Sequence, residues 1–165
     1  MKEELIRYYK DLYDFDNWSL ASEREISGLR TFSLHLSKGS AYQRVSQEVT
    51  PPMWGESLYT HSETLRKGKV DFCVKLWPYH TKEKAKEGML ERMIASVPFE
   101  KAEDIHIGDL CYTHPIRPNS YLLFLSSKTM VEITVYEEGN HMEDIKELAS
   151  TIVAQMKDVR NRMLA

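Results

Sequence analysis

The stretch from Tyr121 to Val159 constrains the fold of this chain more than any other part of its sequence. It opens with a short apolar run, Tyr121–Leu125, followed by the polar, turn-like residues 126–129. Residues 130–136 then alternate in polarity, with one side formed by Val131, Ile133 and Val135 and the other by Glu132, Thr134 and Tyr136. Alternation over that length predicts a β-strand that packs one of its faces on a core. The two runs together predict a tight β-hairpin.

A long helix is predicted directly after this hairpin. Residues 137–140 break the strand, and apolar residues then recur at steps of three and four: Met142, Ile145, Leu148, Ala149, Ile152, Val153, Met156 and Val159. This spacing places them along one stripe of an α-helix. Asn140 and Glu143 have the spacing of a capping box, with Asn in place of Ser or Thr. The stretch is a strong signal of fold and carries no chemistry.

Weaker patterns predict the other elements. They are helices over residues 2–13 and 82–96, strands over 30–37 and 70–77, and one or two strand pieces within 105–112. Residues 40–50 fit a helix or a strand, and a loop is predicted at 50–55, which contains Pro51 and Pro52. The structure of residues 40–66 as a whole is left open. Two-faced strands and this element order favour an antiparallel sheet packed with helices. We therefore expect a single α+β domain over residues 1–165, with about five strands and three helices in an αβα-sandwich-like arrangement.

The order of elements in the second half of the chain suggests a family. A helix at 82–96 is followed by Gly108-Asp109 leading into Leu110–Tyr112, then by Leu123–Leu125, Val131–Val135 and a final helix. This order resembles the C-terminal two thirds of small bacterial domains of the Mog1/PsbP-like type. Members of that group are mostly non-catalytic binding or accessory modules, so the resemblance implies such a role here. It brings no set of catalytic residues with it.

Composition and charge exclude some partners. The formal net charge is −3 and the basic residues are scattered, which argues against nucleic acid or an anionic membrane as the partner. No apolar run approaches the length of a membrane span. The first residues are charged and amphipathic, so we expect a cytoplasmic protein, provided that no leader was removed before Met1. We expect the two cysteines, Cys73 and Cys111, to be reduced and packed.

Residues that could perform chemistry do not form a recognisable site. The glycines show no phosphate-binding pattern. The densest group of metal-ligand types is His106, Asp109, Cys111 and His114, but Cys111 and His114 would point to opposite faces of a continuous strand. We therefore expect no metal and no cofactor. We also expect no catalytic residue.

Aromatic residues and histidines concentrate in two places, a predicted loop from Met53 to His61 and the predicted strand end at residues 77–80. Tyrosine and tryptophan suit contact surfaces because each has a large apolar body and one polar atom. The candidate binding residues are Trp54, Tyr59, His61, Trp77, Tyr79 and His80. The alternative is that these rings cover one end of the core.

Our hypothesis is a non-enzymatic binding or accessory domain that acts through contact with another protein, in the manner of an immunity protein that neutralises a toxin. The mechanism would be a desolvated aromatic patch with an acidic rim. The alternative is a small-ligand-binding protein or a thiol- and histidine-dependent enzyme. Its pocket would lie between sheet and helices, with Cys73, His35 and His80 at its mouth.

Overall fold

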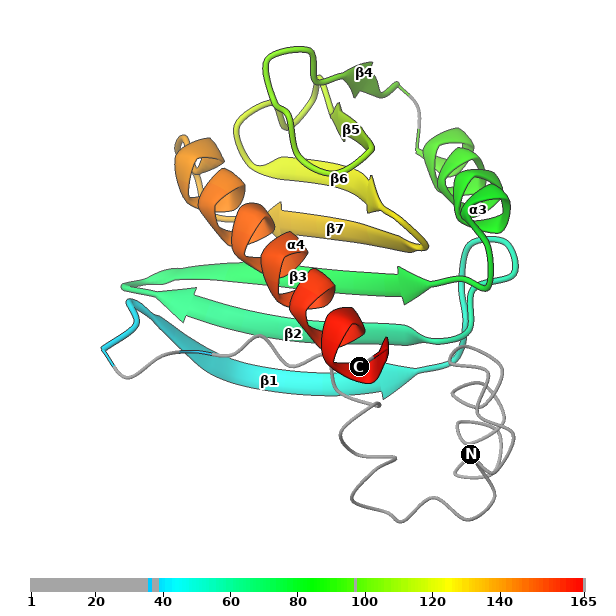
Figure 1. The fold of residues 1–165 in the computed structure, drawn as a ribbon. Helices are drawn as coiled ribbons and strands as arrows, with labels where there is room; N and C mark the ends of the chain where they lie inside the picture. Colours follow the sequence, from blue (N-terminus) through cyan, green and yellow to red (C-terminus); the bar gives the residue numbers. More distant parts are fainter. Residues whose placement is uncertain (1–35, 37–38, 97, 165) are drawn as a thin grey trace.

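One antiparallel sheet of seven strands organises the chain. The computed structural model describes residues 36, 39–96 and 98–164, with the side chains of α4 described up to residue 156. The strands are β1 (Tyr42–Thr50), β2 (Thr60–Lys67), β3 (Val70–Pro78), β4 (Glu100–Lys101), β5 (Leu110–Thr113), β6 (Tyr121–Ser126) and β7 (Thr129–Val135). Their order in the sheet is β1-β2-β3-β7-β6-β5-β4, and every neighbouring pair is antiparallel (Figure 1).

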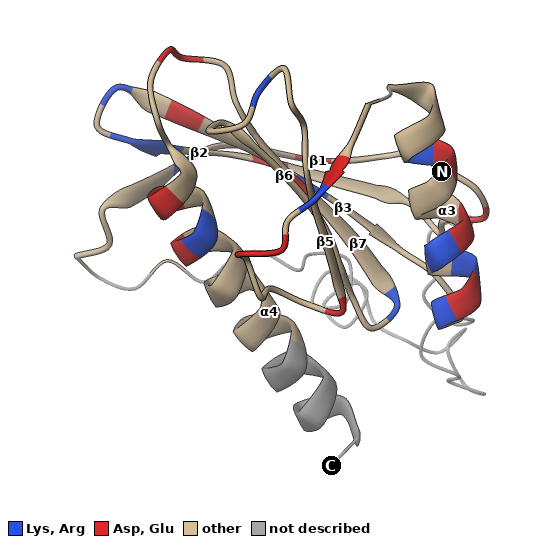
Figure 2. Cartoon of the chain, turned by 90° about the horizontal axis from the view of Figure 1, so that it is seen from above, with Lys and Arg blue, Asp and Glu red and all other residues tan. Residues whose placement is uncertain are grey.

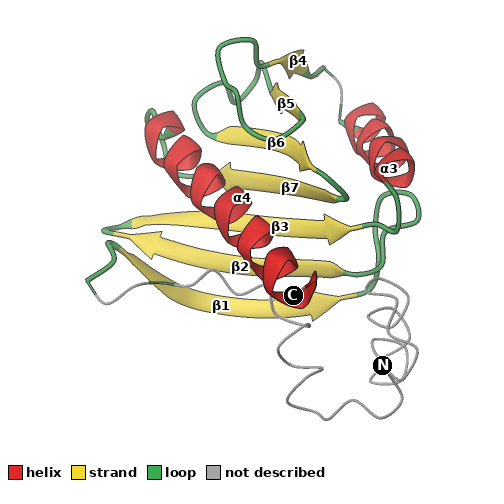
Figure 3. Cartoon of the chain, in the orientation of Figure 1, coloured by secondary structure: helices red, strands yellow, loops and turns green. Residues whose placement is uncertain are grey.

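Two helices cover opposite faces of this sheet. Helix α4 (Met142–Leu164) crosses one face diagonally, and helix α3 (Lys82–Ala95) lies at the end of the sheet where β3 finishes (Figure 3). The alternation along β6 separates the two cores. Leu122 and Phe124 join the core under α4, whereas Leu123 and Leu125 join the core under α3. The described part of the chain is thus an α+β structure with a helix on each side of the sheet.

Three predictions made from the sequence are confirmed. The predicted hairpin is formed by β6 and β7 with a turn at Ser127-Lys128, where Ser127 has a φ of 56°. The predicted helix at 82–96 is α3, and the Thr81 side chain accepts a hydrogen bond from the Lys84 backbone N–H at 3.1 Å as an N-cap does. The final helix is α4, and Asn140 Oδ1 accepts from the Met142 N–H at 3.1 Å.

The predicted number of elements is wrong. The described residues contain seven strands and two helices, where five strands and three helices were expected. The sheet gains strands because residues 40–66, left open by the sequence, form β1 and β2, and because β4 pairs with β5. The predicted helix at 2–13 lies outside the described residues, as does the predicted strand at 30–37 apart from Leu36.

Strand β7 differs from its prediction in how much of it is buried. A strand with one face on a core was expected, but β7 lies in the middle of the sheet between β3 and β6. On its second face, Glu132 contacts Arg92 of α3, and both Glu132 and Thr134 are buried along with the apolar residues of the first face. A glutamate in such a position must be paired, because an isolated buried charge is very costly.

Within the described residues, neither helix combines the length and the apolar character that a membrane-spanning helix requires.

Candidate functional site

Four of the six predicted binding residues are buried. Trp77 and Tyr79 are 1% and 0% exposed, Tyr59 is also buried, and His61 belongs to β2 rather than to a loop. The prediction of a contact surface made by these four side chains must therefore be corrected. β3 runs two residues beyond its register with β2 and carries Trp77 and Tyr79 into the core under α3, whereas His61 pairs with Leu76 and is buried on the α4 face.

Trp77 fastens that loop to the sheet. Its indole Nε1 donates to Thr60 Oγ1 at 3.0 Å, and this hydroxyl in turn donates to the Pro51 carbonyl at 2.8 Å. Leu58 N–H donates to the Pro78 carbonyl at 2.9 Å. The loop between β1 and β2 is therefore held at its beginning and at its end.

Trp54 and His80 are partly exposed, and Trp54 occupies the centre of the loop. The φ angle of Trp54 is 62°, in the left-handed region that bulky side chains rarely adopt. The Tyr79 hydroxyl donates to the Trp54 carbonyl at 2.6 Å, and Ser57 Oγ donates to the Met53 carbonyl. Burial raises the pKa of Tyr79 well above its ordinary value, so its hydroxyl keeps the proton that this hydrogen bond needs.

The same loop lies close against α3. Gly55 follows Trp54 with a φ of 67°, and a Cβ added to Gly55 would lie 3.1 Å from the Gly88 Cα. Gly88 also makes room for Tyr79, whose hydroxyl oxygen would be 2.1 Å from a Cβ at position 88. At the loop's far side Glu56 forms an ion pair with Lys84 at 2.9 Å. Two glycines and one tyrosine thus seat the loop on the helix.

A cation lies beside the Trp54 ring. The guanidinium carbon of Arg92, on α3, is 5.2 Å from the centroid of Trp54, 5.6 Å from that of Phe99 and 6.0 Å from that of Tyr121. Cation–π contacts of this kind strengthen when the cation is withdrawn from water, and the Arg92 side chain is only 15% exposed. We call Trp54, Arg92, Phe99, Tyr121 and Glu132 the arginine cluster.

Glu132 neutralises the arginine from the middle of the sheet. Its Oε2 accepts from Arg92 Nε at 2.9 Å, lies 2.7 Å from Arg92 Nη2, and accepts from the Tyr121 hydroxyl at 2.5 Å. The pKa of Tyr121 is raised far above its ordinary value, first by burial and then by the Glu132 carboxylate. The tyrosine therefore remains a neutral donor, and three donors converge on one carboxylate oxygen.

A histidine completes the wall behind Phe99. The rings of Phe99 and His114 are 5.0 Å apart and nearly perpendicular. His114 Nε2 lies 3.0 Å from the Ser96 carbonyl at the end of α3, and its Nδ1 accepts from the Ile116 N–H at 3.3 Å. Since a carbonyl only accepts, Nε2 carries the proton and both ring nitrogens are paired. This histidine therefore packs against Phe99 and holds it in place beside Arg92.

Most of this cluster was not predicted from the sequence. Arg92 did not stand out because the helix α3 carries both basic and acidic residues along its length (Figure 2). The available signal was Glu132, the one charged residue in the strand β7. Its partner lies 40 residues earlier in the chain, so the pair itself required the fold.

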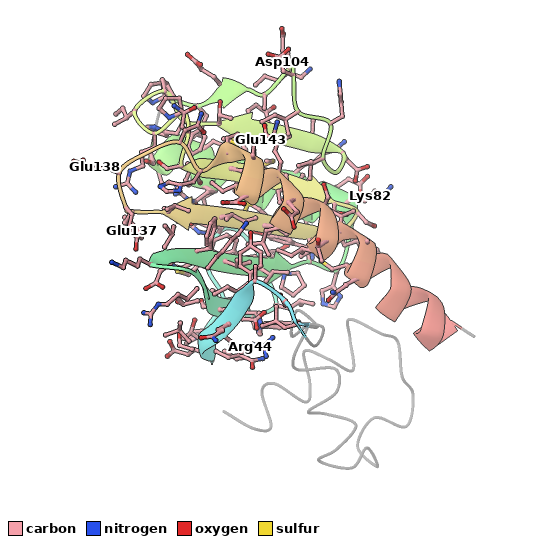
Figure 4. The ribbon with its side chains drawn as sticks, turned by 90° about the vertical axis from the view of Figure 1, so that its left-hand side faces the viewer. Arg44, Lys82, Asp104, Glu137, Glu138 and Glu143 are labelled. Carbon is pink, nitrogen blue, oxygen red and sulfur yellow. The ribbon has the colours of Figure 1, made fainter. Side chains whose placement is uncertain are left out.

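A second buried polar group lies on the α4 face of the sheet. Arg44, which Figure 4 labels at the β1 edge, donates from Nε to Glu63 Oε1 at 2.6 Å. His61 Nε2 is 3.3 Å from Glu63 Oε2, without the geometry of a hydrogen bond. Among the described residues, no three or more histidines, cysteines and acidic residues lie together as a metal site would need.

The two thiols are poorly suited to nucleophilic catalysis. Burial raises the pKa of Cys73 above its ordinary value, and burial raises that of Cys111 to about 12. The thiolate is the reactive form, so both shifts disfavour reaction. The neighbours of Cys73 across the sheet are Thr64 and Thr134. Of the two histidines predicted beside it, His35 lies outside the described residues and His80 lies beyond the end of β3.

Comparison with known proteins does not add to this geometry. No family model matches the chain, and neither a curated protein nor a solved structure is significantly similar to it. The argument for function therefore depends on the site alone.

Proposed function

We propose that this chain is a non-enzymatic protein-binding module and that the loop Pro51–Ser57 is its contact loop. One observation carries the proposal. Trp54 is held in a left-handed backbone conformation at the centre of the loop and is nevertheless partly exposed. Strained residues that the surrounding structure holds in place cluster at functional sites, and the strain costs about 1–3 kcal/mol. Tryptophan is also the residue type most enriched among binding hot spots.

The anchoring of the loop supports this reading. The hydrogen bonds from Tyr79 and Ser57, the close approach of Gly55 to Gly88 and the ion pair of Glu56 all hold the loop from within the protein. Each neutral hydrogen bond contributes about 0.5–1.5 kcal/mol, so together they offset the strain at Trp54. A loop that is ordered before binding loses little entropy when a partner arrives.

The surface of the contact loop has the right chemistry for a protein partner. Pro51, Pro52 and Met53 are exposed, with Met53 at 50%, and they stand beside the partly exposed Trp54. Methionine and tryptophan are enriched at the centres of protein interfaces. The exposed carboxylate of Glu56 lies at the edge of this apolar group. Within the proposal, Glu56 would be the part of the acidic rim that the loop supplies, although its charge is shared with Lys84.

The resemblance to Mog1/PsbP-like domains belongs to the same proposal. A helix on each face of an antiparallel sheet is consistent with that group, whose members are mostly binding or accessory modules. Within the proposal, the partner is neutralised in the manner of a toxin by an immunity protein, inside a bacterial cytoplasm. The modest size and the net charge of −3 support this form of it.

Site-specific photo-cross-linking tests the proposal. A photoreactive amino acid would replace Met53 in the contact loop, and a matched variant would carry it at Tyr136, an aromatic residue that is 70% exposed. Both proteins would be irradiated in a lysate of the source cells. We expect one protein to be joined at Met53 and not at Tyr136, and we expect Trp54→Ala to abolish this adduct while far-UV circular dichroism stays unchanged. Equal adducts at both positions would count against the contact loop.

A further inference from the structure

The orientation of the Trp54 ring is controlled separately from the backbone that carries it. The hydrogen bonds of the contact loop end on the carbonyls of Met53 and Trp54, so they fix the path of the chain. They leave the two side-chain torsions of Trp54 undetermined. The ring packs on one side against the core under α3, and it makes a cation–π contact with Arg92 at 5.2 Å.

Arg92 is well placed to hold that ring because it is itself immobilised. Its Nε and Nη2 both face Glu132 Oε2, and its guanidinium also lies against the rings of Phe99 and Tyr121. Glu132 is buried in β7, the central strand of the sheet. A guanidinium presents several N–H donors in a planar fork, which suits it to bind a carboxylate and stack on aromatic rings at the same time. The arginine cluster is therefore a connection from the middle of the sheet to the contact loop.

We propose that Arg92 is a positioning residue that orders the Trp54 ring for partner binding and that Glu132 fixes Arg92 for this purpose. The inference rests on the proposed function, to which it adds the residue that prepares the anchor. Loss of a fully exposed cation–π contact corresponds to about a two- to fivefold change in the ratio of ordered to disordered ring, and the burial of Arg92 makes this a lower bound. The structural role of the pair must be separated from this effect, because removal of one buried charge alone destabilises a protein strongly.

The test removes both charges together and reads out the ring. The double variant Arg92→Met/Glu132→Met replaces the ion pair with two apolar side chains, an exchange that is often neutral for stability. It is made in a Tyr121→Phe background, with Tyr121→Phe alone as the reference, because the buried Tyr121 hydroxyl would otherwise lose its acceptor. The measurement is ¹⁵N relaxation of the indole N–H of Trp54, with the signal assigned by its loss in Trp54→Phe. Trp77, which is 1% exposed and hydrogen-bonded to Thr60, supplies an internal control in the same spectrum.

We expect the Trp54 order parameter to fall from a rigid value of about 0.85 to below about 0.6 in the double variant. The order parameter of Trp77 should stay unchanged in the same sample. Arg92→Lys keeps a positive charge beside the ring and should remain closer to wild type than the double variant does. Unchanged order of Trp54 in the double variant would overturn the proposal. Equal loss of order in Arg92→Lys and the double variant would also overturn it, because shape rather than charge would then hold the ring.

A second readout connects the ring to binding. The yield of the Met53 adduct should fall at least about twofold in the double variant, in proportion to the ordered fraction of Trp54. If Trp54 is disordered in the double variant but the yield of the Met53 adduct is unchanged, the positioning role of Arg92 is refuted, whereas the proposed contact loop is not. Absence of any adduct at Met53 in the wild-type background would refute the proposed function, whatever the relaxation data show. The two failures are thus distinguishable.

Discussion

Replacement of Gly88 by alanine is the most direct perturbation of the support beneath the contact loop. Gly88 is a buried residue of α3, and its missing side chain makes room for Tyr79. A Cβ at this position would lie 2.1 Å from the Tyr79 hydroxyl oxygen and 2.5 Å from the ring carbon that carries it. Tyr79 is 0% exposed and has no free space to move into without displacing its neighbours. The helix must therefore shift or the tyrosine must leave its position.

The expected cost can be worked out from three contributions. Alanine in place of glycine favours a helix by about 1 kcal/mol. Overpacking of a core costs about 1–3 kcal/mol, and loss of the hydrogen bond from Tyr79 to the Trp54 carbonyl costs about 1 kcal/mol. The sum predicts that Gly88→Ala lowers the free energy of unfolding by about 1–3 kcal/mol. Each kcal/mol corresponds to about 2–4 °C in Tm for a chain of this size.

Urea denaturation followed by circular dichroism measures this change. Glu87→Ala, at the exposed neighbouring position of the same helix, is the matched control and should stay within about 0.5 kcal/mol of wild type. The double variant Gly88→Ala/Tyr79→Phe lacks the oxygen nearest to the new methyl group, so its cost should be less than the sum of the single variants. If Gly88→Ala is as stable as wild type, or more stable by its gain in helix propensity, the proposed seating of the loop on α3 is wrong.

Three further outcomes follow from the same structure. Burial and the carboxylates of Asp144 and Glu147 raise the pKa of Tyr42 to about 12, so folding favours the protonated phenol. The contribution of Tyr42 to the free energy of unfolding should therefore be constant below the ordinary tyrosine pKa of about 10 and be lost as the pH rises towards 12. Urea midpoints at pH 8, 10 and 11 measure this loss. Because burial raises the pKa of both Cys73 and Cys111, iodoacetamide should modify the folded protein more slowly than the denatured protein at pH 8, and equal rates by mass spectrometry would contradict the packed state of the thiols. Arg92→Met alone leaves the Glu132 carboxylate without its ion-pair partner and should lower the free energy of unfolding, measured by urea denaturation, by about 3–5 kcal/mol. The Arg92→Met/Glu132→Met double variant should lose much less. Equal losses would show that the ion pair is not the important contact.

The sequence predicted the elements whose buried faces are apolar. Strands β3 and β7, the apolar strand β6 and the stripe of α4 all carry a local pattern that a reader can recognise without the fold. Strand β2 was missed because its α4 face carries His61 and Glu63 beside Leu65, which hides the alternation. Strand β1 was left open because a bulge between Arg44 and Ser46 shifts its register and leaves Val45 exposed.

The candidate site was predictable only in part. Trp54 and its position in a proline-containing loop were recognised from sequence, and the structure places that ring at the centre of the contact loop. Trp77 and Tyr79 were recognised as aromatic neighbours, but their burial depends on how the loop folds over the end of β3. Arg92 and Glu132 meet only when α3 packs on β7, an event that no local pattern encodes. Pairings across the fold are therefore what sequence reasoning could not supply.

The central claim, that Trp54 anchors a protein partner, is tested most directly by one affinity measurement. The protein joined at Met53 would be purified and titrated calorimetrically into wild type, Trp54→Ala and the surface control Tyr136→Ala. A hot-spot residue contributes at least about 2 kcal/mol, so Trp54→Ala should raise Kd at least about 30-fold while Tyr136→Ala leaves it unchanged. A Kd for Trp54→Ala within about twofold of wild type, in a variant with an unaltered melting curve, would contradict the account.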